Sequence, residues 1–210
     1  NHWSFGKSFE RTHQMYNLGM SGLPYELIIN SNPSIAYLMR ENPLYLQVLI
    51  MAHCVGHSDF FKNNRMFSHT RPESIVSSMR NAKKRIQGYV ENPHIGIEKI
   101  ENLLDSLHAI QFHIYRHPKV YVSHSQRKRE LLEEINLEIS AGKSPDLSAL
   151  NNIPIEPEQD MFSFLLEHGQ NYEDWEIDLI EIVKREAYYF MPQIQTKIMN
   201  EGWASYWHYK

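Results

Sequence analysis

Apolar residues recur at helical spacing along most of the chain. In the first such stretch they stand mostly three to five positions apart, and Asn42 and Pro43 in front of it supply a helix start. Pro72 and Glu73 stand near the start of a second stretch, and Pro118 follows the end of a third. The pattern predicts helices over 44–64, 72–90, 97–115, 160–169, 172–190 and 193–209.

Strand patterns are short by comparison. Ile28 and Ile29 are β-branched and apolar, which predicts a strand over 25–30, and the polar run 30–34 predicts a turn and a helix cap. A charged helix followed by Gly142 and several prolines predicts a connector or insertion at 118–159. We therefore predict a mainly α protein, a single domain over 1–210 with at most a minor β-hairpin or short strands, whose helical parts are 1–117 and 160–210.

Composition and charge limit the kinds of molecule that the chain is expected to bind. Hydrophobic residues make up 42% of the chain and charged residues 22%, which is typical of a globular protein. A net charge of -4 and a pI of about 6.3 argue against nucleic acid as the main partner. The single cysteine, Cys54, cannot form an internal disulfide, and neither a signal peptide nor an apolar run of membrane-spanning length is present. These features predict a cytoplasmic protein without a transmembrane segment; the oligomeric state stays open.

The sharpest chemical motif is an H-x-x-x-H pair, His53 and His57, on a predicted helix. Residues four apart lie on one helical face, so both imidazoles can bind one metal ion. In H-E-x-x-H metallopeptidases the residue after the first histidine is the general base, a glutamate, whereas here it is Cys54. A lone buried cysteine is more often an inert small side chain than a nucleophile or a ligand. The proton acceptor must therefore come from elsewhere, and Asp59, two residues beyond His57, is a candidate base or partner to a ligand.

A second polar stripe lies on the helix predicted over 97–115. Glu101, Asp105 and His108 are spaced four and three apart, which aligns them on one face together with Glu98. An acid three residues before a histidine is typical of di-iron helical bundles. A solvated charged stripe explains Glu98, while His108 is kept as a candidate metal ligand.

A third feature lies on the last predicted helix. Glu201 and His208 are seven residues apart, so they occupy one side of the helix. An acid on a later helix is what a helical metallohydrolase uses as its third ligand, and a buried structural ion pair is the competing interpretation. Two imidazoles and one carboxylate favour zinc, with iron or manganese as alternatives if Asp105 and His108 enlarge the site.

Three longer blocks resemble the signature blocks of SpoVR-like proteins. They read YELIINSNPSIAYLM from Tyr25, HCVGHSDFFKNN from His53 and MNEGWASYWHY from Met199, and the opening residues 2–7 support them. The resemblance implies a cytoplasmic bacterial protein needed for spore cortex formation, with relatives also in bacteria that form no spores. Relatives are longer, so the resemblance implies that a C-terminal part of the full protein is absent here.

A weaker similarity concerns gluzincin-type helical metallohydrolases, in which an EGWA motif follows an H-x-x-x-H helix. It implies a zincin-like helical core in which His53, His57 and Glu201 bind the metal. His208, Asp59 or Glu26 would then have to replace the missing glutamate base.

The sequence leaves three hypotheses. The first is a zinc-dependent hydrolase that acts on an amide bond of a peptidoglycan precursor or of a cortex-assembly protein. The second is a non-catalytic scaffold or regulator of cortex assembly with a degenerate zincin-like core, suggested by Cys54. The third, a di-metal oxidase-like protein, requires a second acid and histidine pair to match Asp105 and His108, and ranks last.

Overall fold

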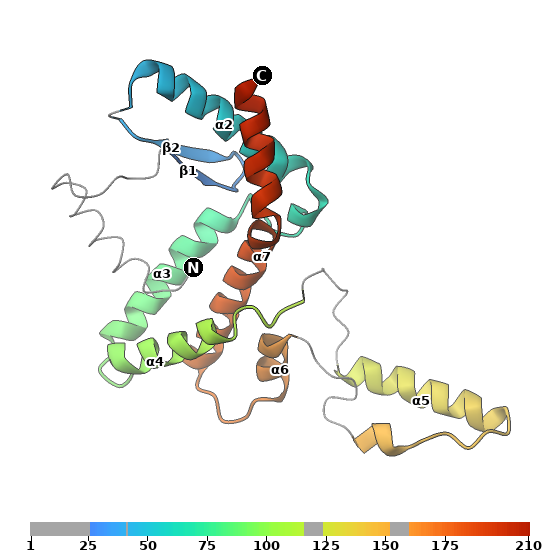
Figure 1. Ribbon diagram of the computed structural model, residues 1–210. Helices are drawn as coiled ribbons and strands as arrows, with labels where there is room; N and C mark the ends of the chain where they lie inside the picture. Colours follow the sequence, from blue (N-terminus) through green and yellow to red (C-terminus); the bar gives the residue numbers. More distant parts are fainter. Residues whose placement is uncertain (1–25, 41, 116–123, 152–159) are drawn as a thin grey trace. The chain divides into compact units, whose positions relative to one another are not determined.

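The computed structural model describes residues 26–40, 42–115, 124–151 and 160–210 (Figure 1). The block at 2–7, Tyr25 and parts of the predicted connector lie outside these residues. Along the chain the elements are β1 Glu26–Ile29, β2 Ile35–Leu38, α2 Leu44–Asn63, the 3-10 helix η1 Arg65–Phe67, α3 Ile75–Glu91, α4 Gly96–Ala109, α5 His124–Ser140, the 3-10 helix η2 Ser148–Asn151, α6 Met161–His168 and α7 Asp174–Tyr209.

The chain divides into two compact units, Asn1–Phe112 with Asn171–Lys210, and His113–Gln170. In the second unit α6 begins where Asp160 accepts hydrogen bonds from the backbone N–H groups of Phe162 and Ser163, at 3.0 and 3.2 Å. Such a cap satisfies amide groups that have no partner inside the helix. The segment predicted as a connector, 118–159, falls within this unit.

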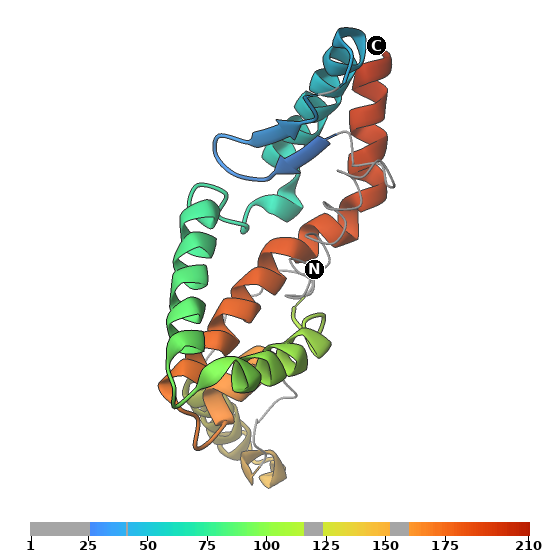
Figure 2. The same cartoon turned by 90° about the vertical axis from the view of Figure 1, so that its left-hand side faces the viewer.

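The first unit is built around α7. Glu173 and Glu176 form a capping box at its start, which favours helix initiation there. Arg85 of α3 donates to Asp178 Oδ2 at 2.8 Å, and Tyr89 donates to the same oxygen at 2.9 Å. These bonds fix α3 against the N-terminal half of α7, and Figure 2 shows the two helices side by side.

Helix α7 differs from the prediction because it does not break near residue 192. It continues for 36 residues with Pro192 inside, where we predicted two helices. An interior proline costs about 3 kcal/mol or more, but the neighbouring Tyr189, Met191 and Thr196 are all buried, and this packing keeps the helix continuous. The helix bends in its middle part (Figure 2), as expected of an interior proline.

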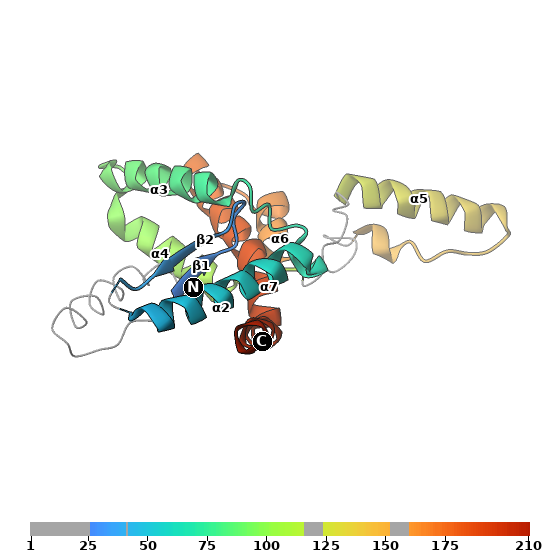
Figure 3. The same cartoon turned by 90° about the horizontal axis from the view of Figure 1, so that it is seen from above.

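The two strands form an antiparallel hairpin in which Glu26 pairs with Leu38 and Ile29 with Ile35. The turn at 30–34 was predicted, but a second strand follows it and not a helix. The hairpin lies beside α2 in the views of Figures 1 and 3. A mainly α fold with a minor β-hairpin is confirmed, and α4 ends at Ala109, earlier than predicted. Among the helices that the structure describes, none is long and apolar enough to cross a membrane.

Candidate metal centre

Helices α2 and α7 approach each other closely at Gly56 and Ala204. A Cβ atom placed on Gly56 would lie 2.7 Å from Ala204 Cα, and Ala204 is fully buried. Only a residue without a side chain allows the two backbones to come so near. Gly56 precedes His57, and Ala204 stands four residues from both Asn200 and His208, so this contact brings the polar side chains of both helices together.

Both histidines of the H-x-x-x-H pair bind α7 through Nδ1. His53 Nδ1 lies 2.9 Å from His208 Nδ1, and His57 Nδ1 lies 2.8 Å from Asn200 Oδ1. Because an amide oxygen only accepts, His57 donates its Nδ1 proton to Asn200. A neutral His57 then carries its lone pair on Nε2, which is the tautomer that a metal ligand needs.

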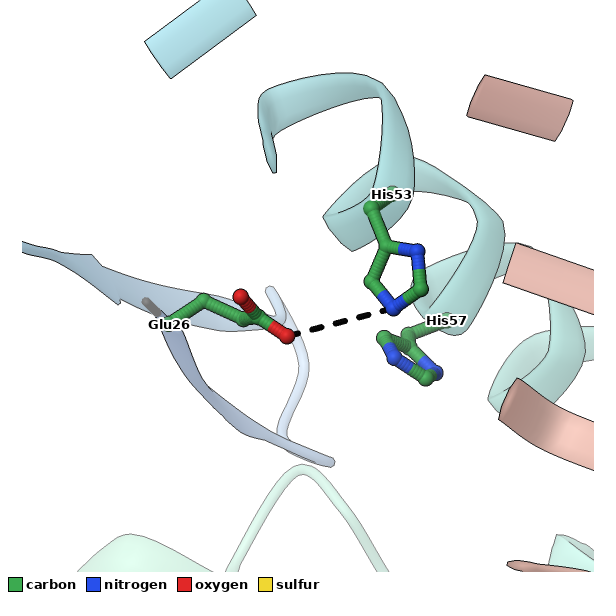
Figure 4. A group of neighbouring side chains, drawn as sticks. All are labelled: Glu26, His53 and His57. Carbon is green, nitrogen blue, oxygen red and sulfur yellow. Dashed lines mark ion pairs between the residues drawn. The ribbon is translucent and has the colours of Figure 1, made fainter. Parts of the chain in front are cut away.

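The Nε2 atoms of both rings face carboxylates. Glu201 Oε2 lies 3.6 Å from His53 Nε2 and 3.7 Å from His57 Nε2, while Glu26 Oε1 lies 3.9 Å from His53 Nε2. Figure 4 shows the Glu26 carboxylate pointing from β1 toward His53. Ligand atoms of Glu26, His53 and His57 all lie within 4.8 Å of one another.

These separations are too long for hydrogen bonds and fit a shared cation. Hydrogen bonds from nitrogen to oxygen measure about 2.7–3.2 Å. Ligand atoms on one tetrahedral zinc, each about 2.0–2.1 Å from it, lie about 3.4 Å apart. The distances from both Nε2 atoms to Glu201 are close to that value, so the residues present fit a divalent ion.

Burial favours the neutral form of His53. Desolvation is the largest influence that lowers the pKa of His53, and neighbouring His57 lowers it further, against opposing effects of Glu26 and Glu201. A neutral imidazole has a lone pair for a metal ion. Glu201, whose side chain is 53% exposed, keeps this cluster in contact with solvent.

Cys54 and Asp59 flank the cluster without joining it. Cys54 is buried, and desolvation followed by the charge of Glu26 raises the pKa of its thiol, which favours the protonated thiol over a thiolate. Asp59 accepts a hydrogen bond from Trp203 Nε1 at 2.9 Å and another from Asn63 at 2.7 Å. Its carboxylate therefore ties α2 to α7.

His108 lies elsewhere in the same unit. Its Nδ1 contacts Leu104 O at 2.8 Å, and its Nε2 lies 3.8 Å from Glu186 on α7. Glu186 and Glu201 are separated by roughly 22 Å of helix at 1.5 Å per residue. The structure thus brings together Glu26, His53, His57, Glu201 and His208, and it places His108 in a separate contact.

Sequence reasoning missed three residues that build the site: Asn200, Gly56 and Ala204. The signal for Asn200 was its spacing, because Asn200, Ala204 and His208 repeat every four residues on one face of α7. Gly56 lies inside the H-x-x-x-H motif, where only the paired helix reveals its role.

The fold and the cluster define a mainly α protein with two histidines and two carboxylates gathered between α2, α7 and β1. The family model described as "SpoVR like protein" matches residues 1–210, and the chain belongs to the SpoVR-like family. It is 38% identical over 223 residues to an Escherichia coli K12 protein called "Uncharacterized protein YcgB", with 99% of this chain and 43% of that protein covered. The chain thus spans less than half the length of this curated relative. No solved structure matches the chain.

Proposed function

We propose that this chain is a metal-dependent hydrolase in which His53, His57 and Glu201 hold a zinc ion. One observation carries the proposal: both histidines are fixed through Nδ1 by α7, and both Nε2 atoms lie 3.6 to 3.7 Å from the same Glu201 oxygen. Two imidazoles and a carboxylate with a further open position are typical of catalytic zinc. Iron or manganese are the alternatives, since Glu26 would add a second carboxylate.

Glu26 is the proton acceptor in this proposal. Glu26 Oε1 lies 3.9 Å from His53 Nε2, whereas Glu201 Oε2 lies 3.6 to 3.7 Å from the Nε2 atoms of both histidines. Glu201 is therefore the better ligand, and Glu26 remains for proton transfer. A bound zinc ion would polarise a carbonyl group and activate water. The residues around it position the ligands: His208 and Asn200 hold the rings, and Phe61 stacks on His57 with centroids 6.3 Å apart.

The substrate and the biological role in this proposal come from the family. An amide bond of a peptidoglycan precursor, or of a protein of cortex assembly, is the expected target. The proposed setting is the cytoplasm of a cell that forms a spore cortex. Membership of the SpoVR-like family supports this setting.

A non-catalytic scaffold or regulator is the second candidate. It is favoured by Cys54, which stands where H-E-x-x-H enzymes carry their base and whose raised pKa, caused mainly by burial, keeps it protonated. In this alternative the same residues would hold a structural metal ion and no reaction would follow.

Two glutamate variants separate these functions. Glu201→Gln should weaken zinc binding at least tenfold in competition with a chromogenic chelator, and Glu26→Gln should bind zinc within about threefold of wild type. Hydrolysis of an N-acetylmuramoyl dipeptide and of casein peptides is then followed by mass spectrometry for each zinc-loaded protein. Glu98→Gln, an exposed glutamate of α4, is the matched control.

The hydrolase predicts cleavage by wild type and Glu98→Gln, and its loss in Glu26→Gln despite bound zinc. Zinc binding without cleavage of either substrate by the wild type would favour the scaffold. Equal zinc affinity in wild type and Glu201→Gln would refute the ligand assignment.

A further inference from the structure

A second feature of the first unit is a cavity of about 720 Å³ beside the C-terminal end of α2. Three segments form its walls: the hairpin turn, the end of α2 and the chain through η1. Phe61 and Phe67 line it and are buried, with exposed fractions of 8% and 3%. Ligand pockets characteristically combine such an apolar base with a few well-placed polar groups.

The hairpin side of the cavity is held in place by hydrogen bonds. Asn30 donates to Thr70 Oγ1 at 3.1 Å, its carbonyl accepts from Tyr189 at 3.0 Å, and the N–H of Asn32 donates to Pro72 O at 3.1 Å. These bonds link the turn to the chain before α3 and to α7. The cavity is therefore preformed, which lowers the entropy lost when a ligand binds.

The charged groups that line the cavity are mostly cationic. Lys62 and Arg65 both belong to the lining, and within the described part of the chain neither side chain forms an ion pair. Among the described residues that line the cavity, Asp59 carries the only carboxylate, and both of its oxygens already accept hydrogen bonds from Asn63 and Trp203. Arginine and lysine together bind oxyanions well, because a guanidinium group can donate two parallel hydrogen bonds to a phosphate or carboxylate.

We propose that this cavity binds a small organic anion, which presents a phosphate or carboxylate group to Lys62 and Arg65 and an apolar face to Phe61 and Phe67. Ser58 lies between Val55 and Phe61 on α2, lines the same space and offers a hydroxyl group. The proposal does not depend on a metal ion at His53 and His57. The competing explanation is structural: Lys62 lies in the last turn of α2, where a cation stabilises the helix end.

Isothermal calorimetry with phenyl phosphate, benzoate and benzyl alcohol tests the proposal on the whole chain. The three probes share an aromatic ring, and they differ in carrying a phosphate, a carboxylate or no charge. At least one anion should bind tenfold more tightly than benzyl alcohol, and added inorganic phosphate should compete with phenyl phosphate. The preferred anion identifies the group that the cavity recognises.

Two variants locate the binding. Lys62→Ala/Arg65→Ala should weaken anion binding about tenfold or more, because each charged hydrogen bond contributes substantially. Arg80→Ala/Lys84→Ala removes the same charges from the exposed face of α3 and should leave binding unchanged. Ser58→Leu keeps both cations but fills part of the cavity, and it should also weaken binding, with circular dichroism confirming the fold.

A purely structural role for Lys62 and Arg65 makes a different prediction. Their removal would lower the free energy of unfolding and leave anion affinity as in the wild type. That result, an equal loss in the α3 control, or no anion binding at millimolar concentration would each overturn the proposal.

Discussion

Replacement of Gly56 by alanine tests the helix contact that assembles the cluster. The added Cβ would lie 2.7 Å from Ala204 Cα and 3.3 Å from Ala204 Cβ. Because carbon atoms in contact settle about 3.5–4.0 Å apart, α2 and α7 must separate by at least about 0.8 Å. The obstacle is backbone, which cannot rotate away as a flexible side chain can.

The magnitude follows from two opposing effects. Alanine gains about 1 kcal/mol over glycine from helix propensity, while overpacking of a tight contact costs about 1–3 kcal/mol. Gly88 of α3 has nothing within 4 Å of an added Cβ, so Gly88→Ala gains the propensity without the clash. We expect Gly56→Ala to be about 2 kcal/mol less stable than Gly88→Ala, which is the middle of the overpacking range.

Urea unfolding in the presence of a chelator measures this difference, and zinc titration of the same variants measures its effect on the cluster. Zinc sites tolerate ligand displacements of about 0.2 Å, so the separation of α2 from α7 should also weaken zinc binding in Gly56→Ala at least tenfold. If Gly56→Ala were as stable as Gly88→Ala and bound zinc equally well, the contact would not position the histidines and the reasoning would be refuted.

Three further predictions concern single residues. Asn200→Ala should weaken zinc binding about 10–100-fold in a chelator competition, because His57 loses the acceptor that fixes its tautomer; unchanged affinity would contradict this. Cys54→Ala should keep wild-type zinc affinity, and native Cys54 should resist a thiol reagent at pH 7.5 until urea unfolds the chain, because it is buried with a raised thiol pKa. The pKa of His108 is raised: burial, the largest influence, opposes protonation, but the Glu186 carboxylate 3.8 Å from Nε2 and the hydrogen bond to Leu104 O outweigh it. Its charged form therefore stabilises the fold below the ordinary pKa near 6.5, and this contribution is lost as the pH rises through the higher folded pKa. Urea unfolding should show that His108→Gln loses more free energy of unfolding at pH 6 than at pH 9. An equal or opposite pH dependence would refute the pairing.

Local pattern predicted most of the helices because their apolar residues recur at helical spacing. The start of α2 at Leu44 and the positions of α6 follow the predicted spacing closely. The sequence pattern predicted a break near Pro192, but α7 continues through it. Tyr189 and Thr196 are buried in the folded unit, and this packing outweighs the local preference of proline for a break. The pattern also missed β2, whose short sequence pairs with β1 across the turn.

The candidate site was likewise predicted only in part from the sequence. Helical periodicity alone brings His53 to His57 and Glu201 to the side of His208, since each pair lies on one helix. The meeting of those helices depends on Gly56 against Ala204, and the approach of Glu26 depends on the hairpin, neither of which spacing reveals. His108 is a residue type that can bind metal, but it lies on α4 near Glu186, which belongs to the N-terminal half of α7.

X-ray absorption at the zinc edge tests the central claim most directly. The chain is loaded with one equivalent of zinc and dialysed, and the retained metal is measured with its ligands. We expect about one zinc per chain with two imidazole nitrogens at about 2.0–2.1 Å, oxygen ligands from carboxylate, and no sulfur at about 2.3 Å. Loss of zinc on dialysis, a sulfur ligand from Cys54, or a spectrum without two imidazoles would contradict the proposed metal centre.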